Sequence, residues 1–496
     1  MSIDTSFERF ESEYKLTEPQ VLWKKYSSDL DTPVSASLKL MQHEDFFFLL
    51  ESVQSGESRG RYSIIGLDPQ CIWKWENNTA LYSSDATNFE EINEAPLENL
   101  RKMIKHSQFD LPEPLPKMAA GMIGFMSYDA IRAVEPSVGD SNPDPIDIPT
   151  AIYVKPRLVL IFDSVFGEVF VVYTLWPEDK KSLEHDYKKA CDAIEGIMDK
   201  LKRRSIESDY SNQSDNQPIQ FRSNFSEPDF KKMVAQCKDY IKAGDIFQVV
   251  PSQRFEADFT HKPFSFYRAL RQTNPSPYLF FLNFGEFQLI GSSPEVMVRL
   301  EDNSVTIRPL AGTRPRGKTA QEDVALSSEL LADQKELSEH LMLVDLSRHD
   351  VGKVSKAGTV KVTEQMIIEY YSHVMHISSN VDGELDPRFD CLDALLAGLP
   401  LGTVSGAPKI RAMQIIDEYE AVKRSFYAGS VGYFAASGDM NTCVTLRTAL
   451  IKNGTLYIQS GCGVVADSDP QKEYDETINK AKALMTAAEH SATFDQ

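Results

Sequence analysis

Strand-like segments in this chain follow one another through short turns, and this order most limits the fold that it can adopt. Between residues 246 and 308, short apolar runs alternate with turn residues, and a long helical pattern begins only at Ala320. A doubly wound α/β chain would instead place a helix after nearly every strand. The pattern therefore predicts an α+β fold.

Residues 205–220 form the best linker candidate, because they carry Ser, Asn, Gln and Asp with little apolar content. The whole chain has 496 residues, which is too long for one compact core. We therefore expect an N-terminal region of residues 1–204 and a C-terminal region of residues 221–496, the two being intertwined.

Local patterns on both sides of this linker predict individual elements. In the first region we expect two strands, at 46–50 and 61–66, joined by a polar turn, and a charged amphipathic helix at 178–204. In the second, Ser226 precedes a helix over 230–243, and a strand is expected at 246–250.

The charge balance narrows the classes of ligand. The chain has 52 Lys and Arg against 73 Asp and Glu, a formal net charge of −21. Such a chain repels nucleic acid and anionic membrane surfaces, so we predict neither as a partner. An anionic small substrate would need locally placed cations, either basic side chains or a metal.

The cysteines and the chain start indicate a cytoplasmic protein. Six cysteines are scattered without a CxxC pair, which is typical of reduced thiols. No apolar signal segment follows Met1. The most apolar stretch, 151–176, is interrupted by charges and predicts strands, not a membrane span.

A phosphate-loop pattern is the strongest competing motif. Residues 312–319 match GxxxxGK[ST] in full, after a strand-like run and before a helix. However, Pro315 removes one of the backbone N–H groups that such a loop points at phosphate. The apolar run 341–345, which could pass for the second strand, continues a helical pattern instead. We interpret the match as accidental.

Two pairs of glutamates have a spacing suited to a metal. Glu336 and Glu339 are three residues apart on an expected helix, as are Glu473 and Glu476, so each pair shares one helix face. Facing each other, the pairs could hold Mg²⁺ with water completing an octahedron. Taken alone, two solvated acidic faces are the more common explanation. A di-iron site is disfavoured because neither pair supplies the required histidine.

Glycine-rich segments and one arginine are candidates for binding an anion. Glycines cluster at 402–406, 429–432 and 461–463, where exposed backbone N–H groups could meet a carboxylate. Arg447 lies in an apolar, strand-like run, 444–448, and a buried Arg usually pairs with an anion. Ordinary turns and a structural ion pair are the alternative.

Two histidines are candidates for acid–base chemistry. His373 and His376 lie among apolar neighbours, and either could act as a general base. A single histidine in such surroundings is more often a hydrogen-bonded core residue. The spacing matches no zinc pattern without further ligands.

Together these segments resemble a known family. The runs 309–317, 339–346, 402–409 and 461–467 are similar to those of the chorismate-utilising enzymes, above all to the large-subunit family of anthranilate synthases. The resemblance is strong from about 228 to 487 and weaker before that, in 49–52 and 60–63. It implies large antiparallel β-sheets packed against each other with outer helices.

The resemblance also implies roles for single residues. Chorismate would be bound by Gly312, Thr313, Tyr427, Arg447, Gly461, Cys462 and Gly463. The catalytic set would be Glu295, His376, Gln248 and Thr403. The metal would be Mg²⁺, with Glu339 and Glu476 as direct ligands and Glu336 and Glu473 acting through water.

Two positions separate the branches of this family. Isochorismate and salicylate synthases carry a water-activating Lys where this chain has Gln248, and glutamine cannot act as a base near neutral pH. The aminodeoxychorismate branch typically carries a nucleophilic Lys where this chain has Ala311. Both positions favour ammonia as the nucleophile and anthranilate as the product, with Glu295 as general acid and His376 as the group that removes a proton.

The resemblance implies two further partners. No glutaminase nucleophile motif is present in the chain, so ammonia would come from a separate glutamine amidotransferase subunit. A tryptophan feedback site would be formed by Ser52, Pro277, Tyr278 and Leu279. We therefore expect L-tryptophan to inhibit the enzyme.

Overall fold

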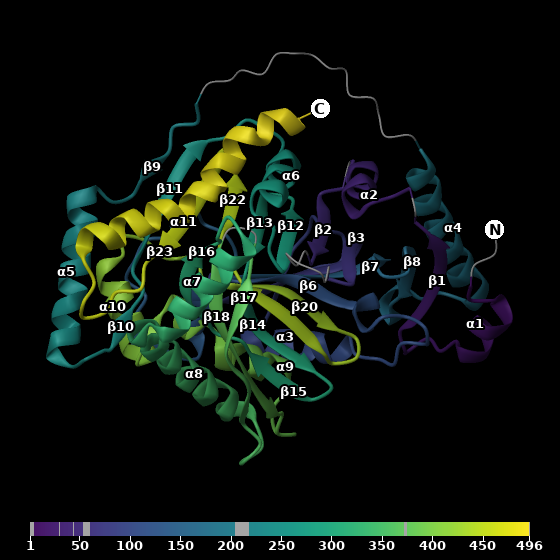
Figure 1. Cartoon of the computed structure of the whole chain (residues 1–496). Coiled ribbons are helices and arrows are strands. Elements are labelled where there is room, and N and C mark those ends of the chain that lie inside the picture. Colours follow the sequence, from purple (N-terminus) through teal and green to yellow (C-terminus); the bar gives the residue numbers. More distant parts are fainter. Residues whose placement is uncertain are drawn as a thin grey trace.

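A computed structural model describes residues 4–28, 30–42, 44–52, 60–203, 218–371 and 374–495. Within these residues, 21 strands join one large sheet whose paired strands are all antiparallel, and helices cover its outer faces (Figure 1). The α+β prediction is confirmed. The predicted linker at 205–220 lies for the most part outside the described residues, as does the turn between the first two predicted strands.

The elements have the following bounds. The strands up to residue 260 are β1 (Gln20–Ser27), β2 (Phe46–Glu51), β3 (Tyr62–Glu76), β4 (Thr79–Ser83), β5 (Glu90–Ile92), β6 (Gly121–Met126), β7 (Ala151–Asp163), β8 (Glu168–Leu175), β9 (Arg222–Ser223), β10 (Gln248–Val249) and β11 (Ser252–Asp258). The later strands are β12 (Tyr278–Phe284), β13 (Phe287–Ser293), β14 (Val296–Glu301), β15 (Ser304–Ile307), β16 (Leu310–Pro315), β17 (Lys361–Tyr370), β18 (Val374–Glu384), β19 (Gly406–Ala407), β20 (Ser430–Ala435), β21 (Met440–Val444), β22 (Thr448–Lys452) and β23 (Thr455–Gly461). The α-helices are α1 (Phe7–Glu13), α2 (Pro33–Leu40), α3 (Pro96–His106), α4 (Leu183–Lys202), α5 (Glu227–Ala243), α6 (Pro263–Thr273), α7 (Ala320–Ala332), α8 (Gln334–Val354), α9 (Cys391–Gly398), α10 (Lys409–Tyr419) and α11 (Pro470–His490).

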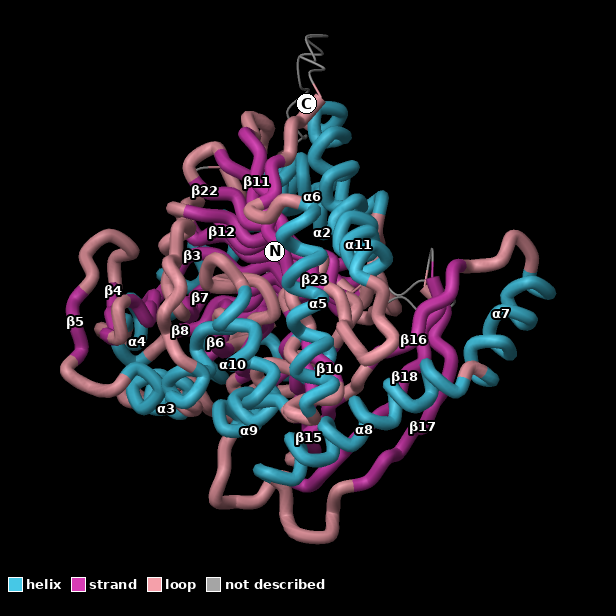
Figure 2. The backbone as a smooth tube through the Cα atoms, turned by 90° about the vertical axis from the view of Figure 1, so that its left-hand side faces the viewer, coloured by secondary structure: helices cyan, strands magenta, loops and turns pink. Residues whose placement is uncertain are grey.

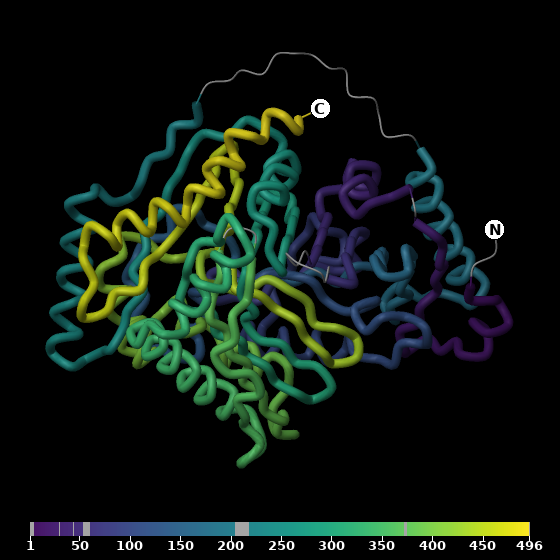
Figure 3. The backbone as a smooth tube through the Cα atoms, in the orientation of Figure 1, coloured from purple at the N-terminus to yellow at the C-terminus, as the bar shows by residue number. Residues whose placement is uncertain are grey.

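Strands from early and late parts of the chain alternate in the sheet. β2 pairs with β12 over six residues, from Phe46 opposite Phe284 to Glu51 opposite Leu279. β6 pairs with β20 in the same way, so the blue and yellow-green tubes run side by side in Figure 3. No boundary at residue 204 therefore divides the sheet.

The apolar core is shared in the same manner. The largest buried cluster joins Leu40 of α2, Ile194 of α4, Leu270 of α6 and Leu484 of α11 to the strands beneath them. Burying these apolar side chains is the main source of stability for such a layered fold. The last helix is thus packed on the same core as helices from the first half.

Several predicted elements are confirmed with small changes in their bounds. β2 and β3 pair as the first two predicted strands, and the stretch 151–176 forms β7 and β8. The helix predicted at 178–204 begins later, at Leu183. α5 begins after Ser226, whose side chain accepts a hydrogen bond from the Asp229 amide, and ends at Gly244, which has a φ of 84°.

Three predicted elements need correction. The strand expected at 246–250 is reduced to two paired residues, Gln248 and Val249. The long helix from Ala320 is two helices, because Asp333 ends α7 and its carboxylate caps the first amides of α8. Arg447 does not lie within a strand: it has a φ of 46° in the break between β21 and β22.

Of the segment that matched a phosphate loop, residues 312–315 belong to strand β16, and residues 316–319 lead into α7. β16 pairs with β18, and residues 341–345 lie inside α8, as the helical interpretation of that run predicts. Figure 2 shows β16, β17 and β18 as a curved ribbon flanked by α7 and α8. Rejection of the phosphate loop is therefore confirmed.

Two further findings concern covalent links and membranes. All six cysteines are free thiols, and five of them are buried.

Among the described residues, no helix has both the length and the apolar content needed to cross a bilayer.

Candidate functional site

His376 lies at the centre of the ribbon, between Thr313 of β16 and Glu369 of β17, which are its directly paired neighbours. Its Nδ1 atom is 3.1 Å from the Gly312 carbonyl oxygen and 3.0 Å from Thr313 Oγ1. Burial lowers the pKa of His376 to about 4, and the charge of Arg447 acts in the same direction. His376 is therefore a neutral imidazole at neutral pH, able to accept a proton.

Glu295, in the turn between β13 and β14, has a raised pKa, in contrast to the lowered pKa of His376. Its side chain is buried, and burial raises its pKa to about 8, although the Thr403 hydroxyl and the Leu310 amide near it oppose the shift. A carboxyl group with this pKa is protonated at neutral pH and can donate a proton. A carboxylic acid and a neutral imidazole with such separated pKa values are typical of acid–base catalysis.

Gln248 lies next to Gly463, the last residue of the glycine-rich segment 461–463. A Cβ atom at Gly463 would lie 2.7 Å from Gln248 Nε2, so any other residue at this position would displace the Gln248 amide. Gln248 Oε1 is buried and, within the described part of the chain, has no hydrogen-bond partner. The site thus contains one unused buried acceptor.

The three amides expected to bind a carboxylate are not equivalent. The Cys462 amide donates to the Pro251 carbonyl at 3.1 Å, and the Val464 amide donates to the Val249 carbonyl at 2.8 Å. Cys462 therefore has no amide to offer a ligand. The Gly463 amide makes no hydrogen bond to another described residue, so it is available to an anion.

Tyr427 and Arg447 supply the remaining expected contacts. Tyr427 is buried with its hydroxyl next to Gly461, and burial raises its pKa. Burial lowers the pKa of the Arg447 guanidinium, and no carboxylate of the described residues forms an ion pair with it. An unpaired, half-buried guanidinium is a strong candidate for binding a carboxylate.

Lys480 of α11 is a cation that the sequence analysis missed. Its Nζ lies 2.7 Å from Glu476 Oε1 and 3.0 Å from the Gly461 carbonyl oxygen. Its positive charge also lowers the pKa values of Glu295, His376 and Tyr427, which places these three side chains near it. The signal available in the sequence was its position four residues after Glu476, one helical turn away.

The four glutamates come from the first two turns of two capped helices, with Glu336 and Glu473 in the first turns. Asp333 caps α8 before Glu336, and Asp469 caps α11 before Glu473. Burial raises the pKa of Glu339, and the carboxylates of Glu336 and Glu473 raise it further, so the two helices bring their acids near each other. Burial and Glu476 likewise raise the pKa of Glu473.

These acids fit a hard divalent cation in their chemistry. Glu473 Oε2 is a buried oxygen without a hydrogen-bond partner in the described residues, and oxygen donors suit Mg²⁺. Lys335 lies 3.7 Å from Glu339, and Lys480 pairs with Glu476. Among the described residues, no three His, Cys, Asp or Glu side chains are grouped closely enough to hold an ion as they stand.

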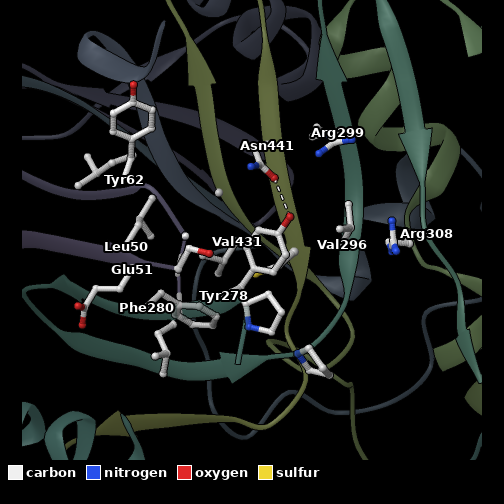
Figure 4. Close-up of a pocket in the computed structure, with 18 of the residues that line it drawn as sticks. Leu50, Glu51, Tyr62, Tyr278, Phe280, Val296, Arg299, Arg308, Val431 and Asn441 are labelled. Carbon is white, nitrogen blue, oxygen red and sulfur yellow. Dashed lines mark hydrogen bonds between the residues drawn. The ribbon is translucent and has the colours of Figure 1, made fainter. Parts of the chain in front are cut away.

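The residues expected to form a tryptophan site line one cavity. This cavity has a volume of about 590 Å³, and Ser52, Pro277, Tyr278 and Leu279 all lie in its wall. Figure 4 shows Tyr278 donating its hydroxyl to Asn441 Oδ1, at 3.1 Å. The structure therefore brings together all four residues of the expected regulatory set.

The cavity wall contains residues that the sequence analysis did not assign. Glu51 accepts hydrogen bonds from Tyr267 and Arg271 and is almost fully buried. Arg308, Glu369 and Tyr371 line the side toward His376. His373, the other candidate histidine, lies outside the described residues.

A buried ion pair behind the site was also missed. The Arg424 guanidinium pairs with Glu420 and donates to the carbonyl oxygens of Val404 and Val250. Glu420 in turn accepts from the amide and hydroxyl of Ser252. This network ties the loop that carries Thr403 to the strand next to Gln248, so it fixes the position of two candidate site segments.

Comparisons with known proteins agree with this architecture. Residues 46–486 match the family described as chorismate binding enzyme. Anthranilate synthase component 1 of Cereibacter sphaeroides is 51% identical over 99% of this chain and 98% of its own length. The corresponding protein of Pseudomonas aeruginosa is 46% identical over 93% of each chain.

Solved structures show the same relationship. The crystal structure of anthranilate synthase component I from Streptococcus pneumoniae has a TM-score of 0.78 and 37% identity, covering 93% of this chain and 99% of that one. The menaquinone-specific isochorismate synthase MenF of Escherichia coli has a TM-score of 0.71 at 20% identity, covering 97% of this chain and 98% of that one, and shares the fold. On the extent of these matches, the chain is an enzyme of the chorismate-binding family, related over nearly its whole length to component I of anthranilate synthases.

Proposed function

We propose that this enzyme converts chorismate and ammonia to anthranilate and pyruvate, with Mg²⁺, and that L-tryptophan inhibits it. The observation that carries the proposal is that a protonated Glu295 and a neutral His376 both lie near Lys480, in one site. The two component 1 relatives, 46% and 51% identical, carry the name of this activity.

Chorismate is a dianion, and the candidate site offers cations to an otherwise acidic protein. Arg447 and the Tyr427 hydroxyl would hold the enolpyruvyl carboxylate. The Gly463 amide, near the Lys480 ammonium, would hold the ring carboxylate. Cationic and amide donors in a buried site are worth more than in water, because the local dielectric is low.

The four glutamates 336, 339, 473 and 476 would hold Mg²⁺. When bound, the ion supplies positive charge that neutralises the ring carboxylate. It would also relieve the mutual repulsion that raises the pKa values of Glu339 and Glu473.

In the first step, the nitrogen lone pair of ammonia forms a bond to C2 of the ring while the C4–O bond breaks. The Glu295 carboxyl group gives its proton to the departing hydroxyl, which leaves as water. Gln248 cannot remove a proton from water, but its unused Oε1 can accept an N–H of ammonia and orient the lone pair toward the ring. Ammonia needs no such activation, since it is already a nucleophile.

In the second step, His376 takes the C2 proton through Nε2. The electrons of the broken C2–H bond then make the ring aromatic and break the C3–O bond, which releases the enolate of pyruvate. This enolate takes a proton from water at its methylene carbon and becomes pyruvate. The Gly312 carbonyl fixes the imidazole tautomer for this role, because it can only accept a hydrogen bond from Nδ1.

The name component 1 in the relatives implies a second component, which we propose to be a glutamine amidotransferase subunit that delivers ammonia. The isolated chain should then form product with an ammonium salt and not with glutamine. Product formation from glutamine by the purified chain alone would refute the need for this partner.

Tryptophan inhibition is assigned to the cavity of about 590 Å³. Replacing Ser52 by Leu would place a larger apolar side chain in its wall, and we expect the inhibition constant for tryptophan to rise at least tenfold. An unchanged constant, with tryptophan still bound, would locate the inhibitor elsewhere.

A further inference from the structure

The cavity and the candidate catalytic residues share one wall. Pro294 and Leu310 line the cavity, while Glu295 and Gly312, one and two residues later in the chain, belong to the candidate site. Tyr371 also lines the cavity, and its ring meets the His376 ring edge-on, with centroids 5.4 Å apart. A single layer of side chains thus separates the two sites.

Glu369 holds Tyr371 in this wall. The Tyr371 hydroxyl donates to Glu369 Oε2 at 2.7 Å, and Arg308 Nε donates to Oε1 of the same carboxylate at 2.8 Å. Glu369 is also the residue directly opposite His376 across the β17–β18 ladder. Paired residues project to the same face of a sheet, so Glu369, Tyr371 and His376 form one contiguous group.

An amino acid bound in the cavity would bring an ammonium group, which could compete for a carboxylate in the cavity wall. Glu51 and Glu369 are the only carboxylates in the described lining. Glu51 has a side chain only 3% exposed and accepts from Tyr267 and Arg271, whereas the Glu369 side chain is 24% exposed. An ammonium group binding at Glu369 would replace the Tyr371 hydroxyl as its donor.

We propose that Tyr371 is a positioning residue through which the cavity controls His376. With the cavity empty, Glu369 holds the Tyr371 ring against the imidazole. When the ammonium group of an amino acid binds Glu369, the Tyr371 hydroxyl loses its hydrogen bond. The Tyr371 ring then no longer holds the His376 imidazole in the position that it needs when chorismate is bound. This inference rests on the proposed tryptophan regulation, and names the residues that transmit it.

A ligand shifts a conformational equilibrium only if it interacts differently with the two states, and competition for Glu369 supplies that difference. Linkage then requires chorismate to weaken tryptophan binding by the same factor by which tryptophan weakens chorismate binding. The coupling can therefore be measured from binding alone, without turnover.

The test measures the dissociation constant of tryptophan by calorimetry, with and without saturating chorismate, in the absence of ammonium. The ratio of the two constants is the coupling, typically ~5–150-fold for linked sites. For Tyr371→Phe, which keeps the ring and removes the hydroxyl, we expect this ratio to fall toward one. The dissociation constant measured without chorismate should stay the same or decrease, because no hydroxyl then competes for Glu369. Glu369→Gln should also lose the coupling, with weaker tryptophan binding.

Tyr278→Phe is the matched control, because it removes another hydroxyl of the same cavity, the one bonded to Asn441. It should alter tryptophan affinity and keep the coupling ratio. If the wild type shows coupling and Tyr371→Phe keeps the same coupling ratio, the proposed role of Tyr371 is overturned. The proposed tryptophan regulation would then still stand. No tryptophan binding or no coupling in the wild type would overturn the proposed regulation together with this inference.

Discussion

The Nδ1 atom of His376 lies 3.1 Å from the carbonyl oxygen of Gly312. A carbonyl oxygen only accepts hydrogen bonds, so Nδ1 carries the proton and the lone pair resides on Nε2. Gly312 reaches this position with a φ of 68°, in the left-handed region that glycine adopts readily. One glycine therefore sets the tautomer of the candidate base.

Replacing His376 by Ala should stop the reaction after amination. Losing a positioned general base typically costs ~10²–10⁴-fold in rate, and here the cost falls on the second step. We expect an aminated, non-aromatic intermediate to accumulate and pyruvate to be absent, as measured by mass spectrometry of the products. His349→Gln, an exposed histidine on α8, is the control that should keep full turnover. Normal pyruvate release by His376→Ala would rule out this role.

Glu295 should give the activity an alkaline limit. The neutral acid is the active form and its pKa is about 8, so activity persists below that pH and declines as the pH rises through it. Initial rates measured at constant free ammonia concentration would give this alkaline limb of the pH–rate profile. Glu295→Gln should lower kcat by ~10²-fold or more and leave no limb near pH 8. The idea fails if Glu295→Gln retains wild-type rates with the same alkaline decline.

The same pKa has a consequence for stability. A carboxyl group whose folded pKa is raised binds more protons in the folded state, so its contribution to stability falls as the pH rises through the range between the unfolded and folded values. We expect the contribution of Glu295 to the free energy of unfolding to decrease from about pH 4.3 to about pH 8 in the wild type. Glu295→Gln should lack this pH-dependent decrease. This contribution can be measured as the difference in unfolding midpoint between wild type and Glu295→Gln at each pH.

The fold class and the acidic pairs could be predicted from local patterns. Ser226 and Gly244 bound α5 through capping chemistry that is visible in the sequence. The three-residue spacing of Glu336 and Glu339 places both on one helix face wherever the helix lies. Neither prediction depends on contacts between distant segments.

Other features depend on tertiary structure and could not be predicted. The apolar run around Arg447 has strand periodicity, but a positive φ breaks the strand there. The pairing of β2 with β12 joins segments more than 220 residues apart, and no local pattern specifies that register. The spacing of Glu420 and Arg424 is that of an exposed helical ion pair, yet both are buried beyond the end of α10.

That buried pair should be important for stability. Removing one partner leaves an uncompensated buried charge, which typically costs ~3–5 kcal/mol. We expect Glu420→Ala to lower the free energy of unfolding by about this amount in denaturant titrations. Asp199→Ala, which breaks an exposed pair with Lys202 on α4, is the control and should stay close to wild type. Equal stability of the two variants would contradict the structural role of the buried pair.

Magnesium should bind the glutamates of α8 and α11. A ligand that binds only the folded protein raises its unfolding temperature, so millimolar MgCl₂ should increase Tm, and a chelator should abolish turnover until Mg²⁺ is restored. Glu339→Gln should lose the Tm increase. Asp345→Asn, on the exposed face of the same helix, should retain it. Full activity in excess chelator would exclude a required metal.

The most direct measurement identifies the products of the purified chain mixed with chorismate, Mg²⁺ and an ammonium salt, with neither glutamine nor a partner protein. Mass spectrometry and fluorescence would follow the aromatic product, and a coupled assay would follow pyruvate. We expect anthranilate and pyruvate in equal amounts, because Glu295 and His376 provide both proton transfers. An aminated chorismate without pyruvate, or hydroxylated products formed from water, would contradict the proposed reaction.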